Sequence, residues 1–139
     1  MLDDDARNFN WLLDSFVEET AGVTDAMAVS SDGLLIASSE TLDCEESDLL
    51  CAIIAGSAGM AVAASRALAA GGLERVIISM ERGFLFVSAV ADGSCLGVVA
   101  TRECDVGSIG FQTTDLVRRA GELLTPALRD ELTHRSASG

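Results

Sequence analysis

The chain opens with hydrophobic residues at helical spacing. From about Asp5 to Glu19, apolar side chains recur every three or four positions, with acidic and polar residues between them. These apolar residues are Phe9, Leu12, Leu13, Phe16 and Val17. The pattern predicts an amphipathic first helix that ends before Gly22.

Two short apolar runs follow this helix. Ala26 to Ser30 and Leu34 to Ser38 are separated by Ser31-Asp32-Gly33. Asp-Gly is a strong hairpin signal because both residues tolerate a positive φ angle. Residues 26–38 are therefore predicted to form a β-hairpin.

The next segment has the features of a long helix. Acidic residues from Asp43 to Asp48 suit the positive end of a helix, and an alanine-rich run continues to about Ala70. Gly71-Gly72 is expected to stop it. Three strand-like segments come after, at 75–80, 84–90 and 95–100, with turns predicted at Arg82-Gly83 and Asp92-Gly93.

A last helix is predicted from about Val106 to Leu124, where apolar residues again follow helical spacing. Thr125-Pro126 is typical of an N-cap followed by proline at the first position of a helical turn. We expect one domain over residues 5–125, and a short helical turn with a flexible tail over 126–139. The order helix, two strands, helix, three strands, helix predicts an α+β fold with a five-stranded antiparallel sheet covered by helices.

The second predicted helix is unusual because Leu49 to Ser65 contains no charged residue. We expect one broad face of it, made of Leu49, Leu50, Ile53, Ile54 and Met60, to pack on the sheet. Small residues line a neighbouring side of the helix. This small-residue stripe consists of Ala52, Ala55, Gly56, Gly59 and Ala63.

The small-residue stripe predicts a homodimer interface. Each glycine inside a helix costs about 1 kcal/mol relative to alanine, so a packing contact should offset Gly56 and Gly59. Small residues in register let a second helix approach closely. Two alternatives remain: the first or last helix covers the stripe, or the high alanine content places small residues there by chance. A membrane span is a third interpretation of this uncharged helix, although seventeen residues is at the short limit for one.

Charge and targeting signals narrow the classes of function. The net charge is −13 and the nine bases, all arginines, are scattered, which argues against binding to nucleic acid or to anionic membranes. Residues 1–5 show no basic and apolar leader pattern, so we expect a cytoplasmic protein. The spacings of Cys44, Cys51, Cys95 and Cys104 fit no common zinc motif, and no metal is expected.

The sequence offers little for catalysis. His134, the one histidine, falls in the polar C-terminal region, and no phosphate-binding glycine motif or lysine is present. We therefore expect no catalytic residue, no cofactor and no enzymatic activity of this chain itself.

Several of these segments together resemble a known family. The stretch from Gly22 to Ser38 (GVTDAMAVSSDGLLIAS), the small-residue helix and the stretch from Gly72 to Ile78 (GLERVII) are similar to the Roadblock family, also called the dynein light chain seven family. The likeness covers about residues 5–125, and the arginine-only bases and high alanine content resemble actinobacterial members.

Membership would imply a homodimer in which the second helices lie side by side and the sheets join edge to edge. It would also imply binding to a Ras-like GTPase and, in some bacterial relatives, acceleration of its GTP hydrolysis. Candidate partner-binding residues are Asp48 and Arg66 at the ends of the helix, and the loop arginines Arg82 and Arg102, which are candidates for an arginine finger. The rival interpretation is a profilin-like or PAS-like sensory domain that binds a small ligand. A scaffold that binds no GTPase is a further alternative.

Overall fold

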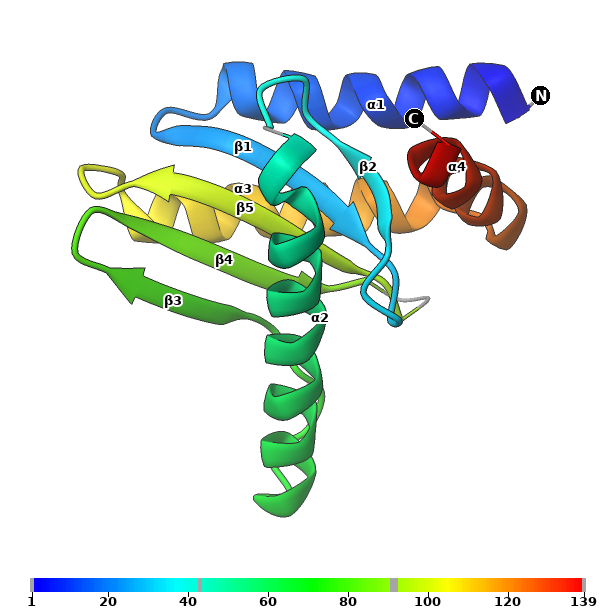
Figure 1. Cartoon of the computed structure of the whole chain (residues 1–139). Helices are drawn as coiled ribbons and strands as arrows, with labels where there is room; N and C mark the ends of the chain where they lie inside the picture. Colours follow the sequence, from blue (N-terminus) through cyan, green and yellow to red (C-terminus); the bar gives the residue numbers. More distant parts are fainter. Residues whose placement is uncertain (1, 43, 91–92, 139) are drawn as a thin grey trace.

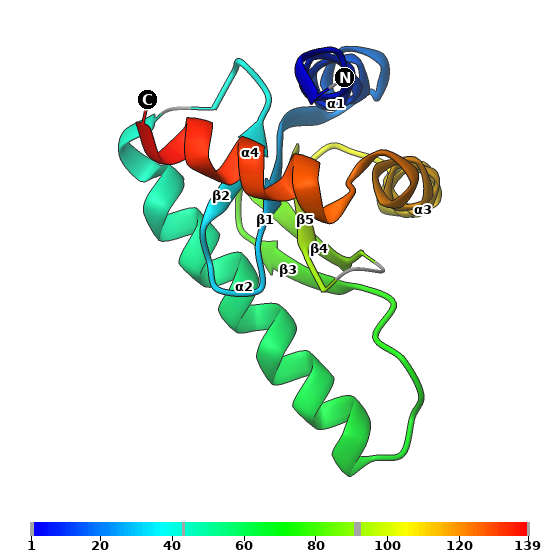
Figure 2. The same ribbon diagram turned by 90° about the vertical axis from the view of Figure 1, so that its right-hand side faces the viewer.

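A five-stranded antiparallel sheet organises the chain, in the strand order β2-β1-β5-β4-β3. The structure is a computed structural model, and it describes residues 2–42, 44–90 and 93–138. Its elements are α1 (Leu2–Glu19), β1 (Val23–Val29), β2 (Leu35–Ser38), α2 (Cys44–Ala67), β3 (Val76–Met80), β4 (Gly83–Ala89), β5 (Cys95–Thr101), α3 (Val106–Leu123) and α4 (Pro126–Ser138). Helices α1 and α3 cover one face of the sheet, and α2 crosses the other (Figures 1 and 2). The predicted α+β fold is confirmed.

Both faces of the sheet are buried because α1 and α3 pack on one and α2 on the other. Along β4, successive side chains alternate between the faces, so Phe84 and Phe86 belong to the core beneath α1 and α3. Leu85 and Val87 belong to the smaller core beneath α2. This two-sided burial accounts for the unbroken apolar run in β4.

The predicted hairpins are confirmed by the antiparallel pairing of β1 with β2, of β3 with β4 and of β4 with β5. Gly33 has a φ of +83° between β1 and β2, and β4 begins at Gly83, the second residue of the predicted Arg82-Gly83 turn. Gly93 also has a positive φ. Asp92 of the last predicted turn and Asp43 of the predicted helix start lie outside the described residues.

The face of helix α2 that packs on the sheet is narrower than the sequence predicts. Cys51, Ile54 and Ala58 are buried beneath it, whereas Leu49 is 65% exposed and Met60 is 73% exposed. The prediction that Leu49 and Met60 pack on the sheet is wrong. Small side chains in the buried row let the helix lie close to the strands, and beyond Ala58 no described residue of α2 is buried. Figure 2 shows this half of α2 extending past the sheet.

Helix α2 ends earlier than the glycine pair predicts. Its last residue is Ala67, and Ala69 adopts a left-handed conformation with φ of 51°. The Ala70 N–H then donates to the Ser65 carbonyl at 2.9 Å, which satisfies one carbonyl at the end of the helix. The chain therefore reverses at Ala69, before Gly71-Gly72.

The C-terminal region differs from the short turn and flexible tail expected for 126–139. Thr125 caps the helix as predicted, since its Oγ1 accepts from the Leu128 N–H at 3.1 Å. The helix then continues to Ser138, because Leu128 and Leu132 are buried in the larger core. Ser136 Oγ donates to the Ile36 carbonyl of β2 at 3.0 Å. Helix α4 therefore packs along the β2 edge of the sheet, while β3 forms the opposite edge.

Candidate functional site: the outer surface of α2 and the sheet end beside it

The small-residue stripe divides into two parts. A side chain added at Gly33 would lie 3.7 Å from Ala55 Cβ and 3.9 Å from Ala52 Cα, so the hairpin turn already packs beside the first two residues of the stripe. A Cβ added at Gly56 or Gly59 would meet nothing within 4 Å. Part of the stripe is thus explained by the close approach of the β1–β2 turn, and the rest faces outward.

The alternative that the first or last predicted helix covers the stripe is wrong. Helices α1 and α3 lie on the opposite face of the sheet from α2 (Figures 1 and 2). Gly56, Gly59 and Ala63 are all exposed in the described chain. Their part in a dimer interface stays a prediction.

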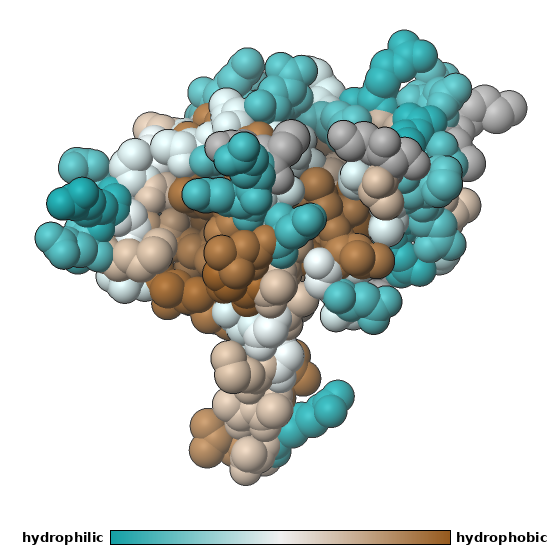
Figure 3. Space-filling model, viewed as in Figure 1, coloured by the Kyte–Doolittle hydropathy of each residue, from teal (hydrophilic) through white to brown (hydrophobic). Residues whose placement is uncertain are grey.

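A groove of about 580 Å³ runs beside α2 on the sheet. Leu50 and Ile53 of α2 form one wall, and Ile78 and Met80 of β3 lie across from them. Leu42, Leu85 and Val99 add apolar surface, while Asp25, Glu46 and Thr41 supply the polar lining. Figure 3 shows this hydrophobic surface beside the upper half of α2.

The four candidate partner-binding residues do not form one site. Asp48 and Arg66 are both exposed, but eighteen residues of helix, about 27 Å, separate them. Arg82 and Arg102 instead lie near each other at one end of the sheet, because Gly83 pairs with Thr101 across β4 and β5.

The two loop arginines differ in their surroundings. The Arg102 guanidinium lies 4.7 Å from the centre of the Phe84 ring and donates to Ser79 Oγ at 2.8 Å. Arg82 is exposed in the β3–β4 turn and lines a shallow apolar pocket with Thr24 and Thr101. An arginine that reaches a partner must leave its own contacts, so Arg82 is the less restrained candidate.

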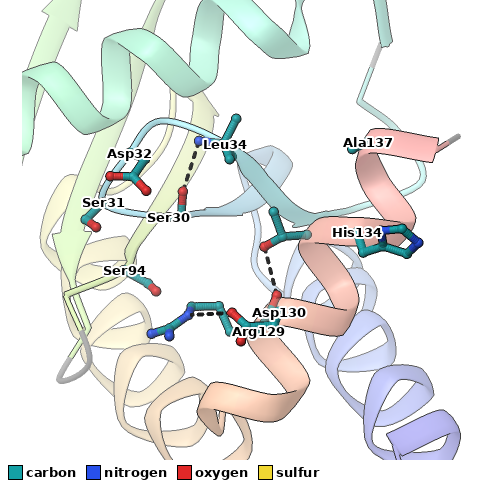
Figure 4. A pocket seen from close by; sticks show the side chains of 10 residues that line it. Ser30, Ser31, Asp32, Leu34, Ser94, Arg129, Asp130, His134 and Ala137 are labelled. Atoms are coloured by element: carbon teal, nitrogen blue, oxygen red, sulfur yellow. Dashed lines mark hydrogen bonds and ion pairs between the residues drawn. The ribbon is translucent and has the colours of Figure 1, made fainter.

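Helix α4 creates a polar cavity that the sequence did not predict. This half-open pocket of about 470 Å³ is lined by the β1–β2 turn, by Ser94 and by one side of α4 that includes Arg129 and His134 (Figure 4). The His134 ring points away from the labelled serines on the other side of the pocket (Figure 4). The sequence signal for this cavity was the leucine pair Leu128 and Leu132, which holds α4 in place.

Cys51 and Cys95 are buried in the core, whereas Cys104 is half-buried. Burial, aided by the nearby charge of Asp48, raises the pKa of the Cys51 thiol from 9.0 to about 11. Such a thiol is protonated and unreactive at neutral pH. Among the residues that the structure describes, no group of three His, Cys, Asp or Glu side chains is placed to hold a metal ion.

Helix α2 also meets the length and composition of a membrane span between Glu45 and Ala67, with 22% of its most apolar stretch buried in the protein. A core helix of a soluble protein meets the same criteria. The contacts of Cys51, Ile54 and Ala58 with the sheet account for the buried part.

Comparison with known proteins agrees with this architecture. Residues 9–100 match the model of the Roadblock/LC7 domain family. A Roadblock/LC7 domain from Streptomyces avermitilis is 28% identical, with a TM-score of 0.75 over 80% of this chain and 92% of that one. No curated protein matches the sequence significantly.

Two more distant structures share the fold. MglB from Myxococcus xanthus is 14% identical, with a TM-score of 0.75 over 84% of this chain and 94% of that one. Profilin IB from Acanthamoeba castellanii is 16% identical, with a TM-score of 0.58 over 82% and 97% of the two chains. The chain is therefore similar both to bacterial Roadblock domains and, more remotely, to profilin.

Proposed function

Since this chain belongs to the Roadblock/LC7 family, we propose that it is a non-enzymatic, homodimeric regulator or adaptor that binds a small Ras-like GTPase in the cytoplasm. One observation carries the proposal. The outer surface of α2 is uncharged over four turns, yet nothing in the described chain covers Gly56 or Gly59. A long apolar helix surface with no cover indicates contact with another protein.

The resemblance to the Roadblock family suggests a Ras-like GTPase as the partner. The exposure of the candidate residues supports a role in binding a partner protein. The four candidate residues Asp48, Arg66, Arg82 and Arg102 are all exposed on the protein surface, where a partner can reach them. In this proposal any bond-breaking step takes place on the GTPase, and this chain contributes a surface.

The rival sensory-domain function depends on a pocket for a small ligand. The α2 groove, at about 580 Å³, has the volume of such a pocket, but exposed side chains such as Ile53 and Met80 form part of its wall. A groove bounded by exposed apolar side chains fits a protein surface better than an enclosed metabolite. A panel of metabolites that leaves the melting temperature unchanged agrees with the docking function.

Binding to a GTPase is tested by affinity capture. The immobilised protein is incubated with native lysate that contains either a non-hydrolysable GTP analogue or GDP, and bound proteins are identified by mass spectrometry. The proposal expects a Ras-like GTPase enriched in the GTP-analogue sample. Absence of a GTPase from both samples contradicts it and favours the sensory domain or a scaffold without a GTPase.

Stimulation of GTP hydrolysis is a separate step of the proposal, and it depends on an arginine. Arginine fingers raise the rate of hydrolysis by about 10³ to 10⁵. We expect Arg82→Ala to remove such stimulation and Arg102→Ala to keep most of it, because Arg102 is held by Phe84 and Ser79. Single-turnover hydrolysis with the captured GTPase measures this. Unchanged stimulation in both variants means that neither arginine is a finger.

A further inference from the structure

Two arginines without a carboxylate partner lie together at one end of the sheet. Within the described residues, neither Arg82 nor Arg102 forms an ion pair, although Glu81 and Glu103 are their neighbours in the sequence. Ion pairs with carboxylates are common elsewhere in this acidic chain, and they include those of Arg7, Arg118, Arg119, Arg129 and Arg135. The two arginines at the sheet end therefore differ from most of the others.

The register of β4 on β5 sets these two positive charges close to each other. Gly83 and Thr101 are the last pair of the ladder at this end, and Arg82 and Arg102 are the next residues outward (Figure 1). Like charges at neighbouring cross-strand positions repel each other and destabilise the pair. A negative charge supplied by another molecule would remove this repulsion.

Arg102 is held in a position that suits a carboxylate. Its guanidinium lies 4.7 Å from the centre of the Phe84 ring, and its Nη1 donates to Ser79 Oγ at 2.8 Å. Among the described residues, the edge formed by Nε and Nη2 has no hydrogen-bond partner. This edge offers two parallel N–H donors, which is the arrangement that binds both oxygens of a carboxylate. Because the side chain is already restrained, binding costs it little conformational entropy.

A shallow apolar pocket lies next to this guanidinium. It has a volume of about 360 Å³, and its lining includes Arg82, Phe84 and Val99. Phe84 connects the two features, since it lines the pocket and its ring also contacts Arg102. An acidic side chain with an apolar neighbour can therefore place its carboxylate on Arg102 and the apolar group in the pocket.

We propose that Arg102 anchors an aspartate or glutamate side chain on the surface of the Ras-like GTPase. In this arrangement Arg102 is a positioning residue, which fixes the GTPase on the sheet end without contact with the reacting phosphate. Arg82, which is exposed in its turn, remains the candidate for the arginine finger. The inference rests on the proposed function and names the chemistry of its binding contact.

A carboxylate fits this site better than a phosphate group does. Glu81 and Glu103 are exposed beside the two arginines, and their charges repel a phosphate, which carries nearly two negative charges, more strongly than a carboxylate. A finger must also extend into the active site of its partner, whereas Arg102 lies against Phe84 and Ser79. Arg102 is thus suited to hold a side chain at the rim of the contact.

The test separates affinity from rate. The GTPase identified by capture is purified and loaded with a non-hydrolysable GTP analogue, and its affinity for wild type, Arg102→Ala and Arg102→Lys is measured by calorimetry. Stimulated GTP hydrolysis is measured separately at a saturating concentration of each protein. Arg7→Ala is the matched control, since it removes the same charge from an exposed side chain of α1. Thermal unfolding verifies that each variant is folded.

We expect Arg102→Ala to weaken binding of the GTPase about ten- to hundredfold, the effect of losing hydrogen bonds to a charged group. Arg102→Lys should recover part of the affinity, because the ammonium group keeps the charge but lacks the two parallel donors. Arg7→Ala should bind as wild type does. At saturation, any stimulation of hydrolysis by Arg102→Ala should equal that of wild type.

Three results overturn the inference. Wild-type affinity in Arg102→Ala shows that this arginine is not an anchor. Equal weakening in Arg7→Ala shows that the effect comes from net charge and not from the sheet end. A lower rate at saturation with unchanged affinity assigns Arg102 to the phosphate. By contrast, a wild-type protein that binds no GTPase contradicts the proposed function itself.

Charge reversal identifies the carboxylate on the GTPase. Arg102→Glu should bind more weakly than Arg102→Ala, because it sets a negative charge against the acidic side chain of the partner. Exposed aspartates and glutamates of the GTPase are then changed to arginine one at a time. We expect one of these changes to restore binding to Arg102→Glu and to weaken binding to wild type. Failure of every such change to restore binding contradicts the anchor.

Discussion

Gly97 shows how one residue sets the position of α2. A Cβ at this point of β5 would lie 2.4 Å from Ile54 Cδ1 and 3.3 Å from Met27 Cγ. The absence of a side chain on β5 lets Ile54 reach the sheet and become fully buried. The groove wall and the projecting half of the helix are positioned by this contact.

Replacement of Gly97 should therefore lower stability. We expect Gly97→Ala to reduce the free energy of unfolding by about 1–3 kcal/mol, because the added methyl group overpacks the core beneath α2. Gly121→Ala in α3 is the matched control, since its methyl group would meet Val90 at 3.7 Å, an ordinary contact. The control should gain up to about 1 kcal/mol from helix propensity. Urea denaturation at one protein concentration measures both, and equal stabilities of Gly97→Ala and wild type would refute the packing argument.

The Cys51 thiol gives a second residue-scale prediction. Because burial raises its pKa from 9.0 to about 11, the thiolate is about a hundredfold rarer at pH 8 than for an ordinary cysteine. Cys51 should resist alkylation by iodoacetamide, while the half-buried Cys104 reacts sooner. Peptide mapping by mass spectrometry follows both sites. Rapid labelling of Cys51 in the folded protein would show that its helix opens readily.

The same shift makes stability depend on alkaline pH. The raised pKa belongs to the folded state, so the unfolded chain loses the Cys51 proton first. The contribution of the protonated thiol is complete below pH 9 and declines between pH 9 and about 11. Cys51→Ala should flatten this part of the stability profile.

At the scale of elements, α4 is the largest departure from the sequence-based expectation. Its sequence has no clear apolar stripe, and two leucines four residues apart were too weak a signal for a thirteen-residue helix. The helix forms because Leu128 and Leu132 find a place in the core between α1 and β2, a tertiary contact that local pattern does not contain.

Helix α4 should behave as part of the domain. Leu128 is fully buried, so Leu128→Ala is expected to lower the free energy of unfolding by about 2–5 kcal/mol. Asp130→Ala, an exposed change in the same helix, should stay within about 0.5 kcal/mol of wild type. Thermal and urea unfolding distinguish the two. A small effect of Leu128→Ala would return residues 126–139 to the status of a flexible tail.

Helix α2 illustrates a different limit of sequence reasoning. Its length, its acidic start and its lack of charge were all visible in the sequence, and the small-residue stripe was visible as a pattern. The sequence did not show which row of α2 residues faces the sheet. Cys51, Ile54 and Ala58 face it because the missing side chain at Gly97 leaves room for Ile54 on β5. The groove depends on β3 and β5 as well as α2, so no single segment could reveal it.

At the scale of the whole molecule, the two edges of the sheet are unequal. Helix α4 packs along β2 and bonds to the Ile36 carbonyl, whereas Ile77 and Met80 are exposed on β3. An uncovered edge strand is a site for pairing with another chain. The uncovered β3 edge and the projecting half of α2 lie toward the same end of the molecule (Figure 1). The groove is also lined by β3 residues, Ile78 and Met80.

The hairpin pairings of β1 with β2, β3 with β4 and β4 with β5 were predictable because Asp-Gly and Arg-Gly turns fix antiparallel neighbours locally. The pairing of β1 with β5, which completes the strand order, joins strands far apart in the sequence and was not predicted. Membership in the Roadblock/LC7 family was likewise visible in the segments from Gly22 to Ser38 and Gly72 to Ile78. The arrangement of Arg82 and Arg102 at one sheet end required the register of β4 on β5, which only the folded chain provides.

The central claim is that this dimeric platform binds a Ras-like GTPase, and one capture experiment tests it most directly. Wild-type protein is immobilised and exposed to native lysate with a non-hydrolysable GTP analogue or with GDP. We expect a Ras-like GTPase on wild type in the GTP-analogue sample. No GTPase on wild type with either nucleotide would contradict the account.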